Sequence, residues 1–88
     1  MYNLIFYSKP GCHLCEGLHE KLMQIQDMPL QIEVRDITTN TDWFEKYQYE
    51  IPVLAIKKND TEVVLPRFSP RTSTEKIAQK LMKYIKSE

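Results

Sequence analysis

Apolar residues follow two different periods along the first part of the chain. Residues 2–7 are almost uninterrupted apolar and aromatic, which predicts a strand covered on both faces in the middle of a sheet. From Cys12 onward the apolar residues recur in steps of four, four and three, which predicts a helix that ends before Pro29. The predicted apolar stripe of this helix consists of Leu14, Leu18, Leu22 and Ile25.

The period then changes to strict alternation. Leu30, Ile32 and Val34 alternate with polar residues, which predicts a half-buried strand with these three side chains on its covered face. A strand–helix–strand unit of this length favours a right-handed parallel crossover. The first half of the chain therefore predicts two parallel strands joined by a helix.

The second half predicts a short helix and then a hairpin. Residues 38–42 are rich in capping side chains and precede three aromatic residues, which indicates a short helix anchored by Trp43, Phe44 and Tyr47. Residues 53–56 predict a buried strand, residues 57–61 a polar turn, and residues 62–65 its antiparallel partner.

A final helix completes the predicted order βαβαββα. Thr72 and Glu75 have the spacing of a capping box at its start. Its apolar face is predicted to contain Ile77, Ala78, Leu81, Met82 and Ile85. No repeat, linker or low-complexity segment interrupts this order, and 88 residues are enough for one compact domain over residues 1–88.

Charge and composition exclude some classes of partner. Lys and Arg together number 12, as do Asp and Glu, so the net charge of zero offers no field that would gather nucleic acid or anionic lipid. The chain contains no apolar run of membrane-spanning length, and residues 1–7 lack a basic leader and a cleavage site. We therefore expect a cytoplasmic monomer that binds neither nucleic acid nor membrane.

The two cysteines are the most informative indication of function in this sequence. In a reducing compartment, the Cys-x-x-C spacing of Cys12 and Cys15 indicates redox chemistry or metal binding in place of a permanent disulfide. Both lie where a loop enters a helix, and the positive end of the helix favours thiolate over thiol at its first residues. Cys12 is therefore predicted to be the more acidic nucleophile, and Cys15 to resolve the mixed disulfide.

Lys9 and His13, close to the cysteines in sequence, each allow more than one interpretation. Lys9 adds positive charge near the thiolate, or binds a carboxylate of a substrate such as glutathione, or is simply a solvated loop residue. His13 either supports the thiolate or is an exposed residue. Gly17 inside a helix predicts close packing near the cysteines, because glycine there costs about 1 kcal/mol relative to alanine.

Ile51-Pro52 is the second candidate feature. A proline that opens a buried strand is a place where a cis peptide bond can leave the preceding backbone open to an incoming chain. Because ordinary X-Pro bonds are cis only about 5–6% of the time, the dipeptide by itself favours trans. Only the context of a fold changes that expectation.

Two segments in this order of elements resemble the glutaredoxin branch of the thioredoxin superfamily: Tyr7-Ser8-Lys9-Pro10-Gly11-Cys12-His13-Leu14-Cys15 and Ile51-Pro52-Val53. The chain looks most similar to a small glutaredoxin-like group that carries Cys-x-Leu-Cys. The resemblance spans nearly the whole chain and implies an α/β thioredoxin-like fold with a four-stranded mixed sheet flanked by helices. It also implies that Cys12 is the nucleophile, Cys15 the resolving thiol, Pro52 a cis-proline and Lys9 a glutathione contact.

The chain also departs from that family. Leu14 stands where glutaredoxins usually have Tyr, and residues 66–72 replace a Gly-Gly turn with an acidic cap, so the usual glutathione pocket is incomplete. Arg67 and Arg71 in that segment either supply charge for a substrate carboxylate or are surface residues. Phe6 stands where thioredoxins bury an aspartate.

The expected function is that of a thiol–disulfide oxidoreductase. It would reduce protein or glutathione mixed disulfides, need no resident cofactor, use glutathione as a possible co-substrate, and draw on an electron donor that the sequence does not name. Substrate contacts are predicted at Lys9, Ile51, Pro52 and Arg71.

Two alternatives remain open at this level. In the first, Cys12 and Cys15, with His19 four residues further on the same helical face, bind a metal or share an iron–sulfur cluster between two chains. A structural zinc site needs four ligands, and no second Cys or His pair is present. In the second, the chain is a non-catalytic module that binds extended peptides at Ile51-Pro52, with residues 43–49 as an aromatic surface.

Overall fold

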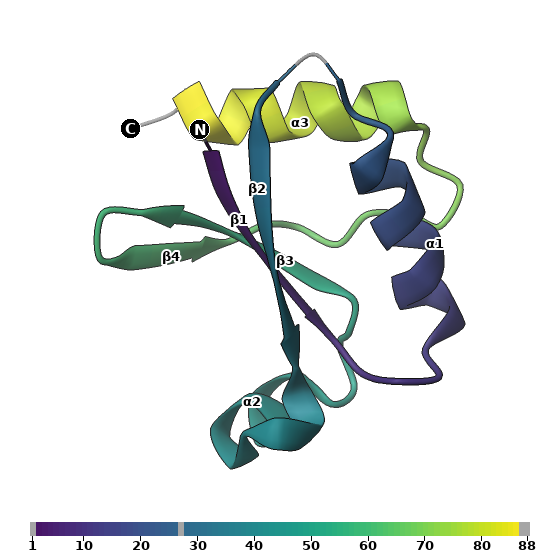
Figure 1. Cartoon of the computed structure of the whole chain (residues 1–88), viewed down its shortest axis with the longest axis vertical. Helices are drawn as coiled ribbons and strands as arrows, with labels where there is room; N and C mark the ends of the chain where they lie inside the picture. Colours follow the sequence, from purple (N-terminus) through teal and green to yellow (C-terminus); the bar gives the residue numbers. More distant parts are fainter. Residues whose placement is uncertain (1, 27, 87–88) are drawn as a thin grey trace.

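The central strand of the sheet is β1, Tyr2–Ser8, in a computed structural model that describes residues 2–26 and 28–86. Strand β2, Leu30–Asp36, lies parallel to it in a register that runs from Tyr2 opposite Leu30 to Ser8 opposite Asp36. On its other side, β3, Val53–Lys58, is antiparallel to β1, and β4, Thr61–Val64, is antiparallel to β3. The sheet therefore has the order β2-β1-β3-β4 and mixes both strand directions (Figure 1).

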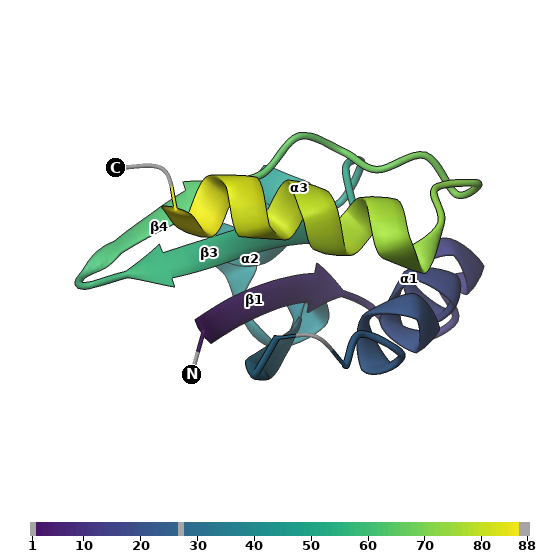
Figure 2. The same cartoon turned by 90° about the horizontal axis from the view of Figure 1, so that it is seen from above.

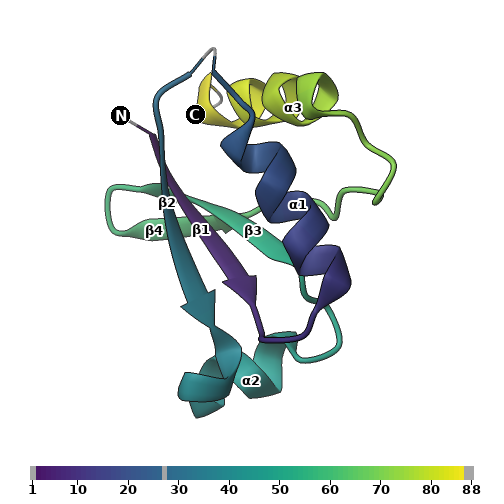
Figure 3. The same ribbon diagram turned by 45° about the vertical axis from the view of Figure 1, so that its right-hand side comes forward.

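In the part of the chain that the structure describes, three α-helices pack around this sheet. Helix α1, His13–Met23, connects β1 to β2. Helix α3, Thr74–Lys86, crosses the end of the sheet near the start of β1 (Figure 1) and lies to one side of β3 and β1 when seen from above (Figure 2). The first turn of α3 meets the end of α1, where the Thr74 hydroxyl donates to the Gln24 side chain at 3.0 Å. Helix α2, Thr41–Tyr47, follows a 3-10 turn at Ile37–Thr39 and lies beyond the carboxyl ends of β1 and β2 (Figure 3). None of the helices in the described residues is long and apolar enough to cross a membrane.

The core confirms the two predicted buried strands. Residues 4–7 of β1 and 53–56 of β3 are all buried, as expected for uninterrupted apolar runs in the middle of a sheet. The predicted α3 face is also confirmed, because Ile77 and Leu81 are completely buried there. The predicted α/β fold, with its βαβαββα order and four-stranded mixed sheet, is therefore confirmed.

Three details of the pattern differ from the prediction. Helix α1 ends at Met23 rather than close to Pro29, because the Gln24 and Ile25 amides turn back onto carbonyls of the last turn. The prediction that Thr72 caps helix α3 is also wrong. The helix begins at Thr74, one residue later than a cap at Thr72 requires, and the Ser73 hydroxyl accepts the Lys76 amide at 3.2 Å.

The third difference concerns β2. Val34 was expected on the covered face, yet it is 53% exposed, while the Arg35 side chain is only 16% exposed. Strand β2 is an edge strand, so its helix-side face is left uncovered where it approaches the start of α1. Alternation alone cannot reveal which face of an edge strand the rest of the fold covers.

Arg35 is covered because it joins a polar cluster at the end of β1. The Tyr7 hydroxyl donates to Glu62 at 2.8 Å, and the Arg35 guanidinium donates to that hydroxyl at 2.9 Å and to Glu62 at 2.8 Å. The Tyr7 ring packs on Tyr47 and Trp43 of α2, with ring centroids 4.5 Å and 5.9 Å apart. This cluster connects β2, β1 and β4 and fastens α2 to the end of the sheet.

The Tyr7 hydroxyl predicts a loss of stability at alkaline pH. Burial and the hydrogen bond to Glu62 raise the pKa of Tyr7 from 10.0 to about 12. Because the folded-state pKa is the higher one, this group's stabilisation is complete below about pH 10 and is lost as the pH rises through about 12. In Tyr7→Phe, the free energy of unfolding should fall less steeply over that range than in the wild type. Urea unfolding at a series of pH values measures the difference.

Tyr49→Phe is the matched control, because the Tyr49 side chain is 88% exposed. It should keep the wild-type alkaline decline. If Tyr7→Phe and Tyr49→Phe decline alike, Tyr7 does not carry the effect.

Candidate active site

The cysteine pair lies where β1 passes into α1. The exposed segment 9–11 makes the turn, and Gly11 has a φ of +79°, a left-handed conformation that other residues rarely adopt. Cys12 is the N-cap of α1: its extended backbone precedes the helix, and its carbonyl accepts the Glu16 amide at 3.1 Å. The Cys12 Sγ atom accepts the Cys15 amide at 3.2 Å. The first sulfur therefore takes the place that a Ser or Asp oxygen takes in an ordinary helix cap.

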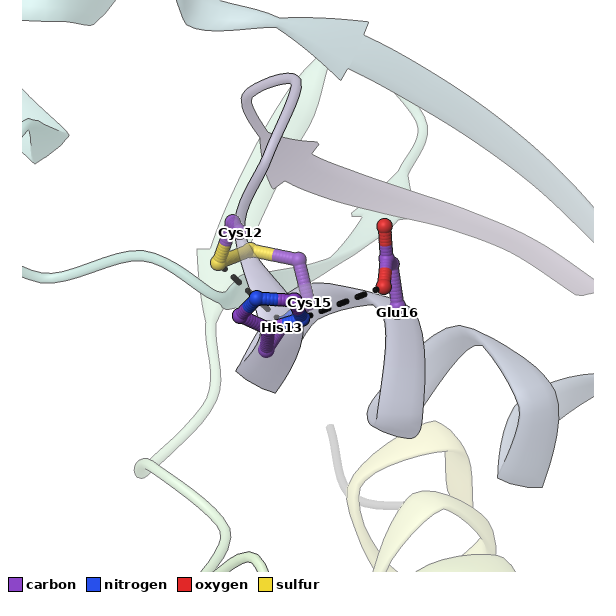
Figure 4. Close-up of a disulfide and its surroundings, with 4 residues drawn as sticks. All are labelled: Cys12, His13, Cys15 and Glu16. Carbon is purple, nitrogen blue, oxygen red and sulfur yellow. Dashed lines mark hydrogen bonds and ion pairs between the residues drawn. A yellow bond between two sulfur atoms is a disulfide. The ribbon is translucent and has the colours of Figure 1, made fainter.

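Cys12 and Cys15 are joined in a disulfide, with Cα atoms 5.2 Å apart (Figure 4). The two sulfurs differ in environment, since Cys12 is half-buried and Cys15 is only 3% exposed. His13 lies between them in sequence but is 96% exposed, and its Nδ1 is 3.6 Å from Glu16. His13 is therefore a surface residue, and Cys12 is more accessible to solvent than Cys15.

A groove runs beside this pair on the side of Pro52. The Ile51–Pro52 peptide bond is cis, as the family resemblance implied and against the expectation for an isolated X-Pro pair. Pro52 borders two adjoining hollows of about 250 and 190 Å³. Residues common to both hollows are Leu18, Pro52, Arg67 and Phe68. We call these two hollows together the Pro52 groove; one end contains His13 and Leu14 of the cysteine segment.

The loop from 66 to 73 forms the wall of the Pro52 groove opposite α1. Lys21 of α1 holds it in place: the Lys21 Nζ atom donates to the carbonyls of Pro70 at 2.6 Å and Thr72 at 2.8 Å. Both arginines of this loop are exposed, but Arg67 lines the groove and Arg71 does not. Sequence reasoning missed the contributions of Phe68 and Lys21, because only the tertiary structure brings this loop against α1.

A separate cavity of about 390 Å³ lies next to the disulfide. Both cysteines line it, together with Lys9, His19 and the exposed Val34. Lys9 and Pro52, which were both predicted to contact substrate, therefore border different depressions. We call this second depression the Lys9 cavity.

The described residues show no set of ligands for the alternative in which Cys12, Cys15 and His19 bind a metal. Among the described residues, no group of three His, Cys, Asp or Glu side chains is arranged to hold a metal ion. His19 instead packs edge-on against the ring of Phe6, with centroids 6.0 Å apart. Phe6, which stands where thioredoxins bury an aspartate, is itself buried, at 2% exposure.

The sequence also matches a known family model. The model of the glutaredoxin-like domain (DUF836) matches residues 3–82, which include both cysteines and Pro52. The chain belongs to this glutaredoxin-like family. No curated protein matches the sequence.

Solved structures show the same fold at low identity. A structural genomics target protein from X. campestris has a TM-score of 0.64 at 21% identity, covering 91% of this chain and 96% of its own. Thioredoxin 1 from Thermosipho africanus has a TM-score of 0.64 at 19% identity, with 94% and 93% covered. A malarial protein reaches 0.67 at 14% identity, with 97% and 98% covered. These similarities establish a thioredoxin-like fold.

The two glycines near the cysteines predict opposite effects of adding a methyl group. A Cβ atom at Gly11 or at Gly17 would meet no atom within 4 Å, so the close packing predicted for Gly17 is wrong. Gly11→Ala should destabilise the protein by about 1 kcal/mol, because only Gly11 has a positive φ. Gly17→Ala should stabilise it by about 1 kcal/mol through helix propensity.

Chemical denaturation of Gly11→Ala and Gly17→Ala, each with the disulfide formed, measures the two changes in the free energy of unfolding. Since neither substitution causes a clash, each is the other's control for an added methyl group. Equal shifts of the same sign would contradict the assignment of the Gly11 turn.

Proposed function

We propose that this chain is a thiol–disulfide oxidoreductase that reduces protein or glutathione mixed disulfides through Cys12 and Cys15. The observation that carries the proposal is the arrangement of the two sulfurs at the start of α1. They are close enough to be bonded, the outer one accepts a helix amide, and the inner one is buried. Membership of the glutaredoxin-like family supports the same chemistry.

The reaction follows from these different environments. In the reduced protein, the Cys12 thiolate attacks one sulfur of a substrate disulfide, forms a mixed disulfide and expels the first substrate thiolate. Cys15 then loses its proton and attacks the Cys12 sulfur, which closes the Cys12–Cys15 bond and expels the second thiolate. The substrate gains two electrons and the two cysteines lose two. Both sulfurs belong to the protein, so the exchange needs no resident cofactor.

The site offers two places for the substrate. We propose that the Pro52 groove receives the chain that carries the disulfide, with Pro52 in its lining and the buried Ile51 directly before it in the chain. Arg67 borders this groove and is better placed than the exposed Arg71 to meet a carboxylate, although Arg71 lies in the same loop. Lys9 is proposed to contact glutathione or another anionic substrate from the Lys9 cavity.

The setting of this activity is part of the proposal. A redox-active pair of this kind suits a reducing compartment, and we propose that the protein works in the cytoplasm as a monomer. Its partners would be a disulfide-bearing protein or glutathione and a separate electron donor, without a nucleic acid or a membrane.

Replacing each cysteine separates attack from resolution. Cys12→Ser should lose disulfide-reductase activity, because no nucleophile remains at the helix N-terminus. Cys15→Ser should still attack but accumulate a mixed disulfide on Cys12, which intact-mass spectrometry detects. In the reduced wild type, Cys12 should be alkylated faster than Cys15 and at a pH below about 8.5, the value for a free thiol. Full activity in Cys12→Ser would contradict the proposed roles.

A comparison of reductants identifies the electron donor. Reduction of a glutathione mixed disulfide by glutathione is measured beside reduction of a protein disulfide by a thioredoxin-reductase system, with Cys12→Ser as the blank in both. Because the chain belongs to a glutaredoxin-like family, we expect the glutathione reaction to be the faster one. Inactivity in both assays would contradict the oxidoreductase proposal itself.

A further inference from the structure

His19 shares the Lys9 cavity with both sulfurs but has no part in the exchange described above. It lies one turn after Cys15 on α1, so both side chains project from the same face of the helix. Its ring is half-buried and rests edge-on against Phe6 at 6.0 Å. Its packing on Phe6, which also lines the cavity, holds the imidazole in the cavity wall.

Cys15 needs help to lose its proton. Only the thiolate attacks a disulfide, and burial disfavours the charged form of a thiol. Cys15 is 3% exposed, and among the described residues no polar or charged side chain is buried beside it in the core. A proton acceptor for Cys15 must therefore come from the wall of the Lys9 cavity.

Three other charged groups line that cavity: Lys9, Glu16 and Asp36. Lys9 is a cation and does not accept a proton. The Asp36 carboxylate accepts the Thr38 hydroxyl at 2.6 Å and the Thr38 amide at 2.9 Å, and these hydrogen bonds lower its pKa, which makes it a weak base. Glu16 is 70% exposed to solvent, and its carboxylate is paired with the His13 ring at 3.6 Å.

An imidazole is the side chain best suited to exchange a proton near neutral pH. We propose, resting on the oxidoreductase function above, that His19 accepts the Cys15 proton in the resolving step, through one water molecule in the Lys9 cavity. Cys15–SH gives its proton to His19, and the resulting thiolate bonds to the Cys12 sulfur. The Cys12–substrate bond breaks, the substrate leaves as a thiolate, and the imidazolium returns the proton to solvent.

The test follows both steps in one reaction. The reduced protein is mixed in a stopped-flow instrument with a symmetrical aromatic disulfide whose thiolate is coloured, so attack by Cys12 and resolution by Cys15 each release one coloured thiolate. In His19→Gln, the first release should keep its rate while the second slows about 100-fold. The second release should also lose the inflection that an imidazole gives between about pH 5 and 8.

Glu20→Gln is the matched control, because it replaces the exposed, titratable neighbour of His19 on α1, which lines neither the Lys9 cavity nor the Pro52 groove. It should leave both steps unchanged. Added imidazole should restore the second step in His19→Ala. It would not do so if His19 had only a structural role.

The outcomes distinguish this inference from the function on which it rests. If wild-type protein releases no coloured thiolate, the oxidoreductase proposal fails. If the wild type shows both steps and His19→Gln resolves at the wild-type rate, the role of His19 is overturned while the function stands. A slower second step that keeps its pH inflection and is not restored by imidazole in His19→Ala also overturns it.

Discussion

The hydrogen bond from the Cys15 amide to the Cys12 sulfur is the interaction on which the candidate site depends. It exists because the Gly11 turn brings the chain from β1 into α1 with Cys12 as the helix cap. A sulfur in that position meets unpaired amides and the positive end of the helix dipole, which stabilise negative charge. The same geometry places Cys15 inside the first turn, bonded to Cys12 and covered by the core.

The sheet holds both halves of the site in place. Strand β1 carries the cysteine turn at its end, and its neighbour β3 begins directly after the cis Ile51–Pro52 bond. The cluster around Tyr7 fastens α2 to the same end of the sheet, and the carbonyl of Tyr47 accepts the Ile51 amide at 3.1 Å. Packing on the face of β1 is thereby linked to the position of the proline beside the sulfurs.

The surroundings of the disulfide are asymmetric. The Pro52 groove presents an apolar floor with Arg67 at its edge, which suits an incoming chain that carries a disulfide. The Lys9 cavity contains the imidazole of His19, which suits a proton exchanged with Cys15. A disulfide-bearing chain bound in the Pro52 groove would thus leave the proposed proton acceptor in the Lys9 cavity in place.

The order of elements, the buried strands β1 and β3 and the position of the cysteine pair could be predicted from the amino-acid pattern, because they depend on local periodicity and on residues three apart. Packing between distant segments decided that Val34 is exposed and Arg35 covered, since the environment of an edge strand depends on its neighbours. It also decided that Lys21 and Phe68 shape the Pro52 groove, and that Gly17 borders open space. Such contacts join residues distant in the chain, and local pattern carries no information about them.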